Sequence, residues 1–337
     1  MDSINSIHMS NKSEYRQLCE SEPTIPLFSR DWWMDATCGE ENWDVALVQE
    51  DGEVKGSFPY LIVRKYGQTV VTMPKLSQFM GPWIKRSENA SYGKQLTSEV
   101  EVITKLIDSL PHFNYFNQNI HYSITNWLPF YWKGFHQTTL YTNIIPDLTD
   151  LDKVYADFEK DVVRRIKQAQ KVLRVSTSED ITKFYEVNIH VFKKQDINVP
   201  YSFDYVKRLD SACQKKGCRR IFMARDESDQ VHAVLYLVWY EESAYILMSG
   251  IDPQFKDEGA MKLLIWEAMK FSQSVTKRFD FEGSMLKPVD TRNRRFNPIQ
   301  VPYSNITKAN GFATKLLESA THWSTSPRLM RWLEQRL

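Results

Sequence analysis

Short stretches of alternating polar and apolar residues predict β-strands, because successive side chains of a strand point to opposite faces. In the first half of the chain, strands are predicted at 43–49, 54–64, 69–73 and 113–118. Asp51-Gly52 separates the first two and is a hairpin turn signal. A helix is predicted at 96–109, between the third strand and the fourth. The predicted order is therefore hairpin, third strand, helix, strand.

The second half repeats this order. Strands are predicted at 220–226, 231–240, 243–249 and 279–283. The helix before the last strand, at 259–276, has apolar residues near 3.6-residue spacing, among them Met261, Leu264 and Ile265. The repetition predicts an α/β (α+β) protein of two tandem domains, each with a mixed, mainly antiparallel sheet flanked by helices. The alternative is two unrelated α+β domains that share common supersecondary parts.

The segment 150–174 joins the two halves and is predicted to be helical. Acidic residues crowd its start and basic residues its end, which suits the helix dipole. We therefore place the first domain at 1–148 and the second at 149–307. The remaining segment, 308–337, has a helical pattern, and we expect it to pack on the first domain.

Composition limits the partners. A length of 337 residues favours two domains. With a formal net charge of +1, we expect no overall electrostatic attraction of the protein to DNA or to a membrane. None of the four cysteines forms a CxxC pair or has a histidine at metal-ligand spacing, so we expect reduced thiols and no metal. No apolar run has the roughly 20 residues that a transmembrane helix needs, and the N-terminal stretch lacks a signal core. We expect a cytoplasmic protein.

The most informative segment begins with Phe-Asp-Phe-Glu-Gly at 279–283. Strand alternation would place Asp280 and Glu282 on one face, at an end that opens into a loop with a cluster of arginines, including Arg294 and Arg295. Such strand ends are where α/β proteins tend to place chemistry. The two carboxylates are candidates for accepting a proton. The alternative is a structural pairing with the nearby arginines.

A basic cluster without acids lies in the joining segment. Arg164, Lys167 and Lys171 follow i, i+3, i+7 spacing and share a helical face, while Arg165 lies on a neighbouring face. Guanidinium and ammonium groups in such a cluster suit phosphate or pyrophosphate. The alternatives are a solvated basic helix end and, more weakly, a nucleic-acid contact.

Three further loops are candidates for substrate contacts. The loop 73–83 is bent by prolines and a glycine and exposes Lys75 and Gln78; a purely structural turn is the alternative. Tyr201 lies in a polar-aromatic loop before a helix, and Tyr303 follows Val301-Pro302.

The helix expected near Gly259 and Ala260 starts after a strand and a loop, where free backbone N–H groups bind phosphates well. Asp257 and Glu258 lie just before it and would repel anions. No serine lies in a nucleophile elbow and no Cys/His pair is evident, which favours direct acyl transfer.

Three segments together carry a family resemblance: VVRRIKQAQK, MPKLSQFMGPW, and FDFEGSM followed by RRFN and VPY. In this order they resemble the tandem acetyltransferase-fold proteins related to FemABX, and in particular uncharacterised bacterial relatives with a domain of the GCN5-related N-acetyltransferase (GNAT) type and an FDFEGSM-type segment. The resemblance extends from about Phe28 to Lys308. Relatives usually carry a glycine after the residue that Phe296 matches, where this chain has Asn297.

The resemblance implies an acyltransferase that delivers an acyl or aminoacyl group to an amine. Aminoacyl-tRNA is the donor in the peptidyltransferases of the family, which act on peptidoglycan precursors; acyl-coenzyme A is the donor that the GNAT fold implies, held at Gly259 and Ala260. No tightly bound cofactor is implied. Arg164, Arg165 and Lys167 match the basic helix start of the second domain, and Arg294 matches a basic residue that stabilises the oxyanion.

The acceptor implied is a small molecule or a cell-wall precursor, with tRNA as a partner if it is the donor. A different class remains open: a non-catalytic protein of the same fold that binds a phosphorylated glycan or a nucleotide. Turnover with either donor would separate the two classes.

Overall fold

The computed structural model describes residues 2–65, 67–87, 89–194, 198–255, 259–283 and 285–311. The chain divides into two compact units: unit 1 takes the chain up to Thr139 and from Tyr303 onward, and unit 2 takes Leu140–Pro302. Both crossings lie inside strands, β6 (His136–Ile145) and β12 (Ile299–Ala309). The boundary that we predicted near residue 149 therefore differs from the bounds of these units. The predicted C-terminal helix lies almost wholly at 312–337, outside the described residues.

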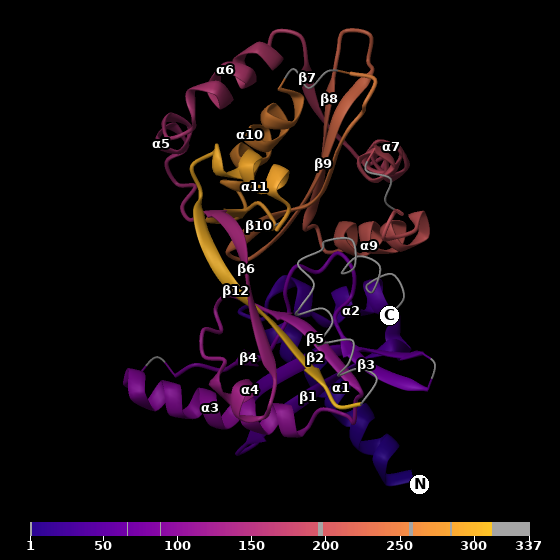
Figure 1. The fold of residues 1–337 in the computed structure, drawn as a ribbon, viewed down its shortest axis with the longest axis vertical. Helices are drawn as coiled ribbons and strands as arrows, with labels where there is room; N and C mark the ends of the chain where they lie inside the picture. The colour runs from indigo at the N-terminus through magenta and orange to yellow at the C-terminus, as the bar shows by residue number, and fades with distance from the viewer. Residues whose placement is uncertain are drawn as a thin grey trace. The chain divides into compact units, whose positions relative to one another are not determined.

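Unit 1 is one mixed sheet with helices (Figure 1). Its strands run in the order β1-β2-β3-β5-β12-β6, and β4 pairs with β2. Besides β6 and β12, its elements are α1 (Asp2–Ser21), α2 (Asp31–Cys38), β1 (Trp43–Glu50), β2 (Glu53–Lys65), β3 (Gln68–Thr72), β4 (Trp83–Ile84), α3 (Tyr92–Asp108), β5 (Tyr115–Ile120) and α4 (Leu128–Trp132), with short 3-10 turns at Leu27–Ser29 and Glu40–Asn42.

The sequence predicted the first hairpin of unit 1 correctly. Asp51 and Gly52 both have positive φ, at 52° and 76°, as a two-residue hairpin turn requires, and they join β1 to β2. The strand β3 then pairs in parallel with β5, which follows helix α3. Phe58, Phe116 and Ile306 are fully buried together in the core of this unit.

Unit 2 has the strand order β6-β11-β10-β9-β8-β7. Besides the ends of β6 and β12, its elements are α5 (Leu151–Ala156), α6 (Lys160–Ala169), β7 (Arg174–Ser178), α7 (Ile181–Asn188), α8 (His190–Lys194), α9 (Phe203–Lys215), β8 (Arg219–Arg225), β9 (Val231–Tyr240), β10 (Ser243–Ile251), α10 (Ala260–Ser272), β11 (Arg278–Asp280) and α11 (Lys287–Arg294).

Helices cover both faces of the unit 2 sheet (Figure 1). On one face, α10 packs on alternate residues of β9, Ala233, Leu235 and Leu237, and α6 packs on α10. On the other face, Phe184 of α7 lies against Tyr236 of β9. The strands β8, β9 and β10 are antiparallel, and β10 pairs in parallel with β11 after helix α10. The order hairpin, third strand, helix, strand is thus present in both units, as the sequence predicted, and the structure adds that the last strand is parallel to the third in each.

The helix predicted at 150–174 is broken into α5 and α6. The break follows from Phe158, which is buried against Trp266 and Phe296. The next residue, Glu159, donates its N–H to the carbonyl oxygen of Arg295 at 3.0 Å. The backbone therefore leaves the helical path so that Phe158 can enter the core.

The strand predicted at 279–283 is also shorter than expected. It ends at Asp280, because Glu282 has a φ of +54° and lies in the left-handed region. The alternation of faces that we expected for Asp280 and Glu282 therefore stops before Glu282. Among the described residues, no helix is both long enough and apolar enough to cross a membrane.

Candidate functional site

Two carboxylates lie at the end of β11, where the sheet of unit 2 opens. The parallel pairing of β10 with β11 stops at Tyr245 and Asp280, although β10 continues to Ile251. Asp280 is fully buried, and its Oδ1 accepts hydrogen bonds from the Thr142 hydroxyl and from the Glu282 N–H, the latter at 2.8 Å. Asp280 therefore holds the turn that presents Glu282.

Gly283 fixes the position of this turn against β6. A Cβ at residue 283 would lie 2.2 Å from the carbonyl oxygen of Tyr141 and 2.6 Å from the Cα of Thr142. Backbone contact this close is possible only for glycine. The Phe281 N–H also donates to the Asn143 carbonyl oxygen at 3.0 Å. Residues 280–283 are thus held against β6 on both sides of Glu282.

The environment of Glu282 makes its carboxyl an unusually strong base. Burial raises its pKa to about 8, and the negative charge of Asp280 adds to the increase. The side chain is half-buried rather than sealed from solvent. A carboxylate with a pKa near the operating pH is suited to take a proton from a reacting group.

Tyr201 lies within electrostatic range of Glu282. Burial raises the pKa of the Tyr201 hydroxyl well above its usual value, and the charge of Glu282 contributes to the increase. The hydroxyl donates to Asn188 Oδ1 at 2.8 Å, and Asn188 Nδ2 donates to the Ser249 carbonyl oxygen of β10 at 2.9 Å. The structure therefore brings together three of the residues singled out in the sequence, Asp280, Glu282 and Tyr201, within unit 2.

Asn188 and Thr142 are polar residues of this site that sequence reasoning missed. Asn188 ends α7, and Thr142 lies in β6, far from β11 in the sequence. Gly250 lets β10 approach α7, since a Cβ there would lie 2.7 Å from the Cα of Asn188. No local sequence pattern marks either side chain, because each acquires its role only from a long-range contact.

The two predicted arginines lie at the end of α11 and contact different parts of unit 2. Arg294 is exposed, with 60% of its side-chain surface accessible, and its Nε pairs with Asp290 one helical turn earlier at 2.8 Å. Arg295 instead contacts the start of α6, through Asp161 at 3.4 Å and Glu159 at 3.8 Å.

Asn297, which follows these arginines, has a φ of +53°. This left-handed conformation favours glycine, and asparagine is among the other residues that adopt it most readily. The asparagine therefore takes the backbone conformation for which a glycine at this position would be suited.

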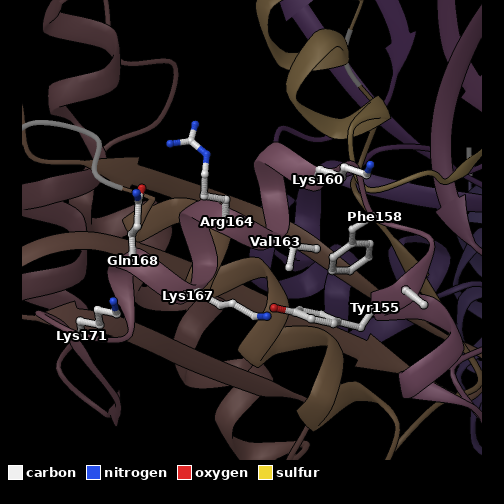
Figure 2. Close-up of a pocket in the computed structure, with 9 residues that line it drawn as sticks. Tyr155, Phe158, Lys160, Val163, Arg164, Lys167, Gln168 and Lys171 are labelled. Carbon is white, nitrogen blue, oxygen red and sulfur yellow. The ribbon is translucent and has the colours of Figure 1, made fainter.

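The predicted basic face of α6 lines a groove of about 660 Å³ (Figure 2). Arg164 and Lys167 line it from α6, as their spacing predicted, and Lys171 lines it from the turn that follows the end of the helix at Ala169. Tyr155, Phe158 and Val163 supply apolar surface, and Lys160 adds a fourth cation. We call this the α5–α6 groove; its residues are Tyr155, Ala156, Phe158, Lys160, Val163, Arg164, Lys167, Gln168 and Lys171.

Arg165 does not line the groove but packs against the start of α10. Gly259, the N-cap of α10, has a φ of +99°, and a Cβ there would lie 2.5 Å from the Arg165 carbonyl oxygen. Gly259 and Ala260 are both buried. The backbone of α6 thus covers the two residues that we predicted for binding a phosphate at this helix start. Asp257 and Glu258 fall outside the described residues.

The remaining predicted residues lie in unit 1. Lys75 is exposed, as predicted. The prediction that Gln78 is exposed was wrong, because the residue is buried and its carbonyl oxygen accepts from Asn119 Nδ2 at 2.8 Å. The ring of Phe79 lies 5.8 Å from that of Tyr303, which is also buried. The structure therefore places Tyr303 beside the loop 73–83, as a second group of predicted residues.

Comparison with known proteins identifies one domain by its sequence. Residues 156–283 match the sequence model of the acetyltransferase (GNAT) domain. The match ends at Gly283, so it includes α6 and the β11 carboxylates. No curated protein matches the sequence of this chain.

Solved structures match the fold over most of the chain. FemX matches 87% of this chain and 95% of its own, with a TM-score of 0.64 and 12% identity. The C-terminal domain of a putative lysylphosphatidylglycerol synthetase from Agrobacterium fabrum matches 92% of this chain and 96% of its own, with a TM-score of 0.53 and 13% identity. L-PGS from Bacillus licheniformis matches 90% and 94%, with a TM-score of 0.55 and 10% identity. At sequence identities this low, the matches show that the proteins share a fold with this chain.

Proposed function

Because the chain has a FemABX-related tandem GNAT fold, we propose that it is an acyltransferase that moves an acyl or aminoacyl group onto an amine by direct aminolysis. The observation that carries the proposal is Glu282. Its carboxyl has a pKa of about 8 and is presented by a turn that Asp280 and Gly283 hold in place. A raised pKa at an opening of the sheet, within a matched GNAT domain, is typical of a general base.

In the reaction, Glu282 takes the proton that the amine must lose. The nitrogen lone pair attacks the acyl carbonyl carbon, and the new C–N bond forms as the proton moves to the Glu282 carboxylate. The tetrahedral oxyanion then collapses and breaks the bond from the acyl carbon to the sulfur or ester oxygen of the donor. This atom takes the proton from the Glu282 carboxyl and leaves as a thiol or a hydroxyl. Asp280 is assigned a positioning role, because its buried carboxylate already accepts two hydrogen bonds.

Charge on the oxyanion needs a cation or an N–H donor. Arg294 is assigned this role in the proposal. Its guanidinium is exposed and is bound only to its own helix through Asp290 among the contacts of the described residues, so it is accessible to a ligand. Replacing Arg294 with alanine would leave turnover unchanged if this assignment were wrong.

The donor in this proposal is acyl-coenzyme A or aminoacyl-tRNA, and the acceptor is an amine of a small molecule or of a cell-envelope precursor. The fold relatives named FemX and lysylphosphatidylglycerol synthetase favour an aminoacyl donor, and the GNAT domain match favours an acyl-coenzyme A donor. The reaction at Glu282 is the same for both.

The test is transfer of a labelled acyl group. The protein is incubated with labelled acetyl-coenzyme A, or with labelled aminoacyl-tRNA, and with a set of amines that includes a UDP-linked muropeptide. We expect transfer with one donor, reduced by about 100-fold or more in Glu282→Gln, which is the usual size of a general-base contribution. Glu186→Gln, an exposed change on α7, is the matched control.

Two results would contradict the proposal. Equal activity of Glu282→Gln and the wild type would remove Glu282 from the mechanism. Absence of transfer with both donors would favour a non-catalytic protein that binds a phosphorylated glycan or nucleotide.

A further inference from the structure

The α5–α6 groove has a rim of cations and a floor of rings. Lys160, Arg164, Lys167 and Lys171 line it, and no aspartate or glutamate does. Arg164 pairs with Asp161, whereas the three lysines form no ion pair with any residue that the structure describes. Uncompensated cations that gather around one hollow favour an anionic ligand.

Lys160, Arg164 and Lys167 are held by the packing of their helix, α6. On its opposite side, α6 buries Val162, Ile166 and Ala169 in the core of unit 2. The helix therefore cannot turn its basic face away. Lys160, Arg164 and Lys167 follow one another at about 6 Å and 4.5 Å along the axis, given a rise of about 1.5 Å per residue. Charges in such a row suit a ligand with more than one phosphate group.

The floor of the groove suits a flat apolar group. The ring of Tyr155 packs at 4.8 Å from Trp266 and at 5.5 Å from Phe158, and it is only half-buried. In Figure 2 the end of Lys167 points towards the Tyr155 hydroxyl. A ring supported from behind, with a cation at its edge, is a surface on which a planar base can stack.

We propose that the α5–α6 groove binds the nucleotide part of a ligand, with its phosphates on Arg164, Lys167 and Lys171 and its base on Tyr155. A bilayer surface fits less well, because the rings line a hollow rather than project from the protein. Two sources share this chemistry: a free nucleotide-bearing molecule, such as coenzyme A or a nucleoside diphosphate, and the end of an RNA strand.

An aromatic path connects the groove to the candidate general base. The ring of Phe158 lies 5.0 Å from Phe296, and Phe296 lies 5.5 Å from Phe281, which directly precedes Glu282. All three rings are buried in one core. A ligand held in the groove is therefore held relative to Glu282. If the proposed function holds, the nucleotide is the handle of a substrate; binding in the groove does not itself require turnover.

Binding is measured by titration calorimetry on the full chain, without any acceptor, using four probes: inorganic pyrophosphate, ADP, coenzyme A and an RNA trinucleotide. Lys167→Glu/Lys171→Glu reverses two exposed charges in the groove. Lys207→Glu/Lys215→Glu makes the same change on α9, also with exposed side chains. We expect the groove variant to weaken nucleotide binding at least tenfold and the control to change it less than twofold.

Tyr155→Leu tests the contribution of the ring at the floor of the groove separately from that of the cations at its rim. We expect it to weaken the binding of ADP or RNA several-fold and to leave the binding of pyrophosphate unchanged.

Tight binding of ADP and coenzyme A identifies a free nucleotide-bearing ligand, and preference for the trinucleotide identifies an RNA end. Absence of binding by all four probes, or equal affinities of the groove variant and the wild type, would overturn the proposal. Tighter binding of pyrophosphate than of any nucleotide, unaffected by Tyr155→Leu, would overturn the nucleotide assignment. If the protein bound the nucleotide but transferred no acyl group, the proposed function would be contradicted and the proposed nucleotide site would not.

Discussion

Glu282 and Asp280 are two residues apart and have opposite environments. Asp280 is fully buried and accepts hydrogen bonds from Thr142 and from the Glu282 backbone, whereas Glu282 is half-buried and carries the raised pKa. The repulsion between the two charges is one cause of that shift. The pair therefore separates into one carboxylate that holds the turn and one that can exchange a proton.

Asp280→Asn tests this division. Asparagine keeps an oxygen acceptor but removes the charge, so the pKa of Glu282 should fall. If Glu282 is the general base, the wild-type rate rises with pH through about 8, and in Asp280→Asn this rise moves to lower pH. The measurement is the pH profile of kcat/KM for both proteins. Asp204→Asn on α9 is the control, and an unmoved profile would show that Asp280 does not act on Glu282.

The raised pKa of Glu282 also predicts how the stability of the protein depends on pH. Its pKa rises from 4.5 to about 8 on folding, so between these values the folded state keeps a proton that the unfolded state has lost. The free energy of unfolding should therefore decrease as pH rises from about 4.5 to about 8. Glu282→Gln cannot ionise and should lack this decrease. Denaturant unfolding at pH 5, 7 and 9 measures it, and parallel curves for the two proteins would contradict the raised pKa of Glu282.

At the scale of elements, the packing of α6 on α10 depends on a glycine. Gly259 has a φ of +99°, and its Cα approaches the Arg165 backbone so closely that a Cβ would lie 2.5 Å from the carbonyl oxygen. Helix α6 in turn positions the cations of the groove. The position of the predicted basic cluster in the fold thus depends on Gly259, which lies almost a hundred residues later in the sequence.

Gly259→Ala should therefore be costly. Strain at positive φ and overpacking together are expected to lower the free energy of unfolding by about 2–4 kcal/mol. Gly217→Ala provides the control, because Gly217 also has positive φ, at 64°, but a methyl group there would have nothing within 4 Å; about 1–2 kcal/mol is expected for this change. Urea unfolding compares the two, and equal losses would mean that α6 does not press on Gly259.

At the scale of the whole molecule, the end of the described chain belongs to the unit in which the chain begins. The strand β12 pairs with β5 in unit 1, and its Ile306 is buried with Phe58 and Phe116. Unit 2 has a separate core on α10. Each unit therefore has its own apolar interior, and unit 1 is completed only by the return of the chain at Tyr303.

Ile306→Ala should loosen unit 1 in preference to unit 2. A cavity at a fully buried isoleucine is expected to cost about 2–5 kcal/mol. Hydrogen exchange should increase in β1, β2 and β5 and remain slow in β8 and β9. Leu264→Ala in α10 should show the reverse pattern. Uniform loss of protection in both variants would show that the two units unfold as one.

The sequence alone determined the elements whose signals are local. Alternation and turn residues predicted the first hairpin and the strands β8 to β10, and helical spacing predicted the shared face of Arg164 and Lys167 on α6. These features depend on residues a few positions apart, so a single stretch contains the whole signal. The segment around Asp280 and Glu282 could likewise be singled out, since polar residues at a strand end are visible in the sequence.

Only the tertiary structure decided what those residues do. It ended β11 at Asp280, broke the long helix at Phe158, and returned β12 to unit 1. It also brought Thr142, Asn188 and Tyr201 to the β11 carboxylates and raised the pKa of Glu282 to about 8. The physical reason is that burial, charge repulsion and backbone approach depend on which distant segments meet, and no pattern within one segment specifies its neighbours.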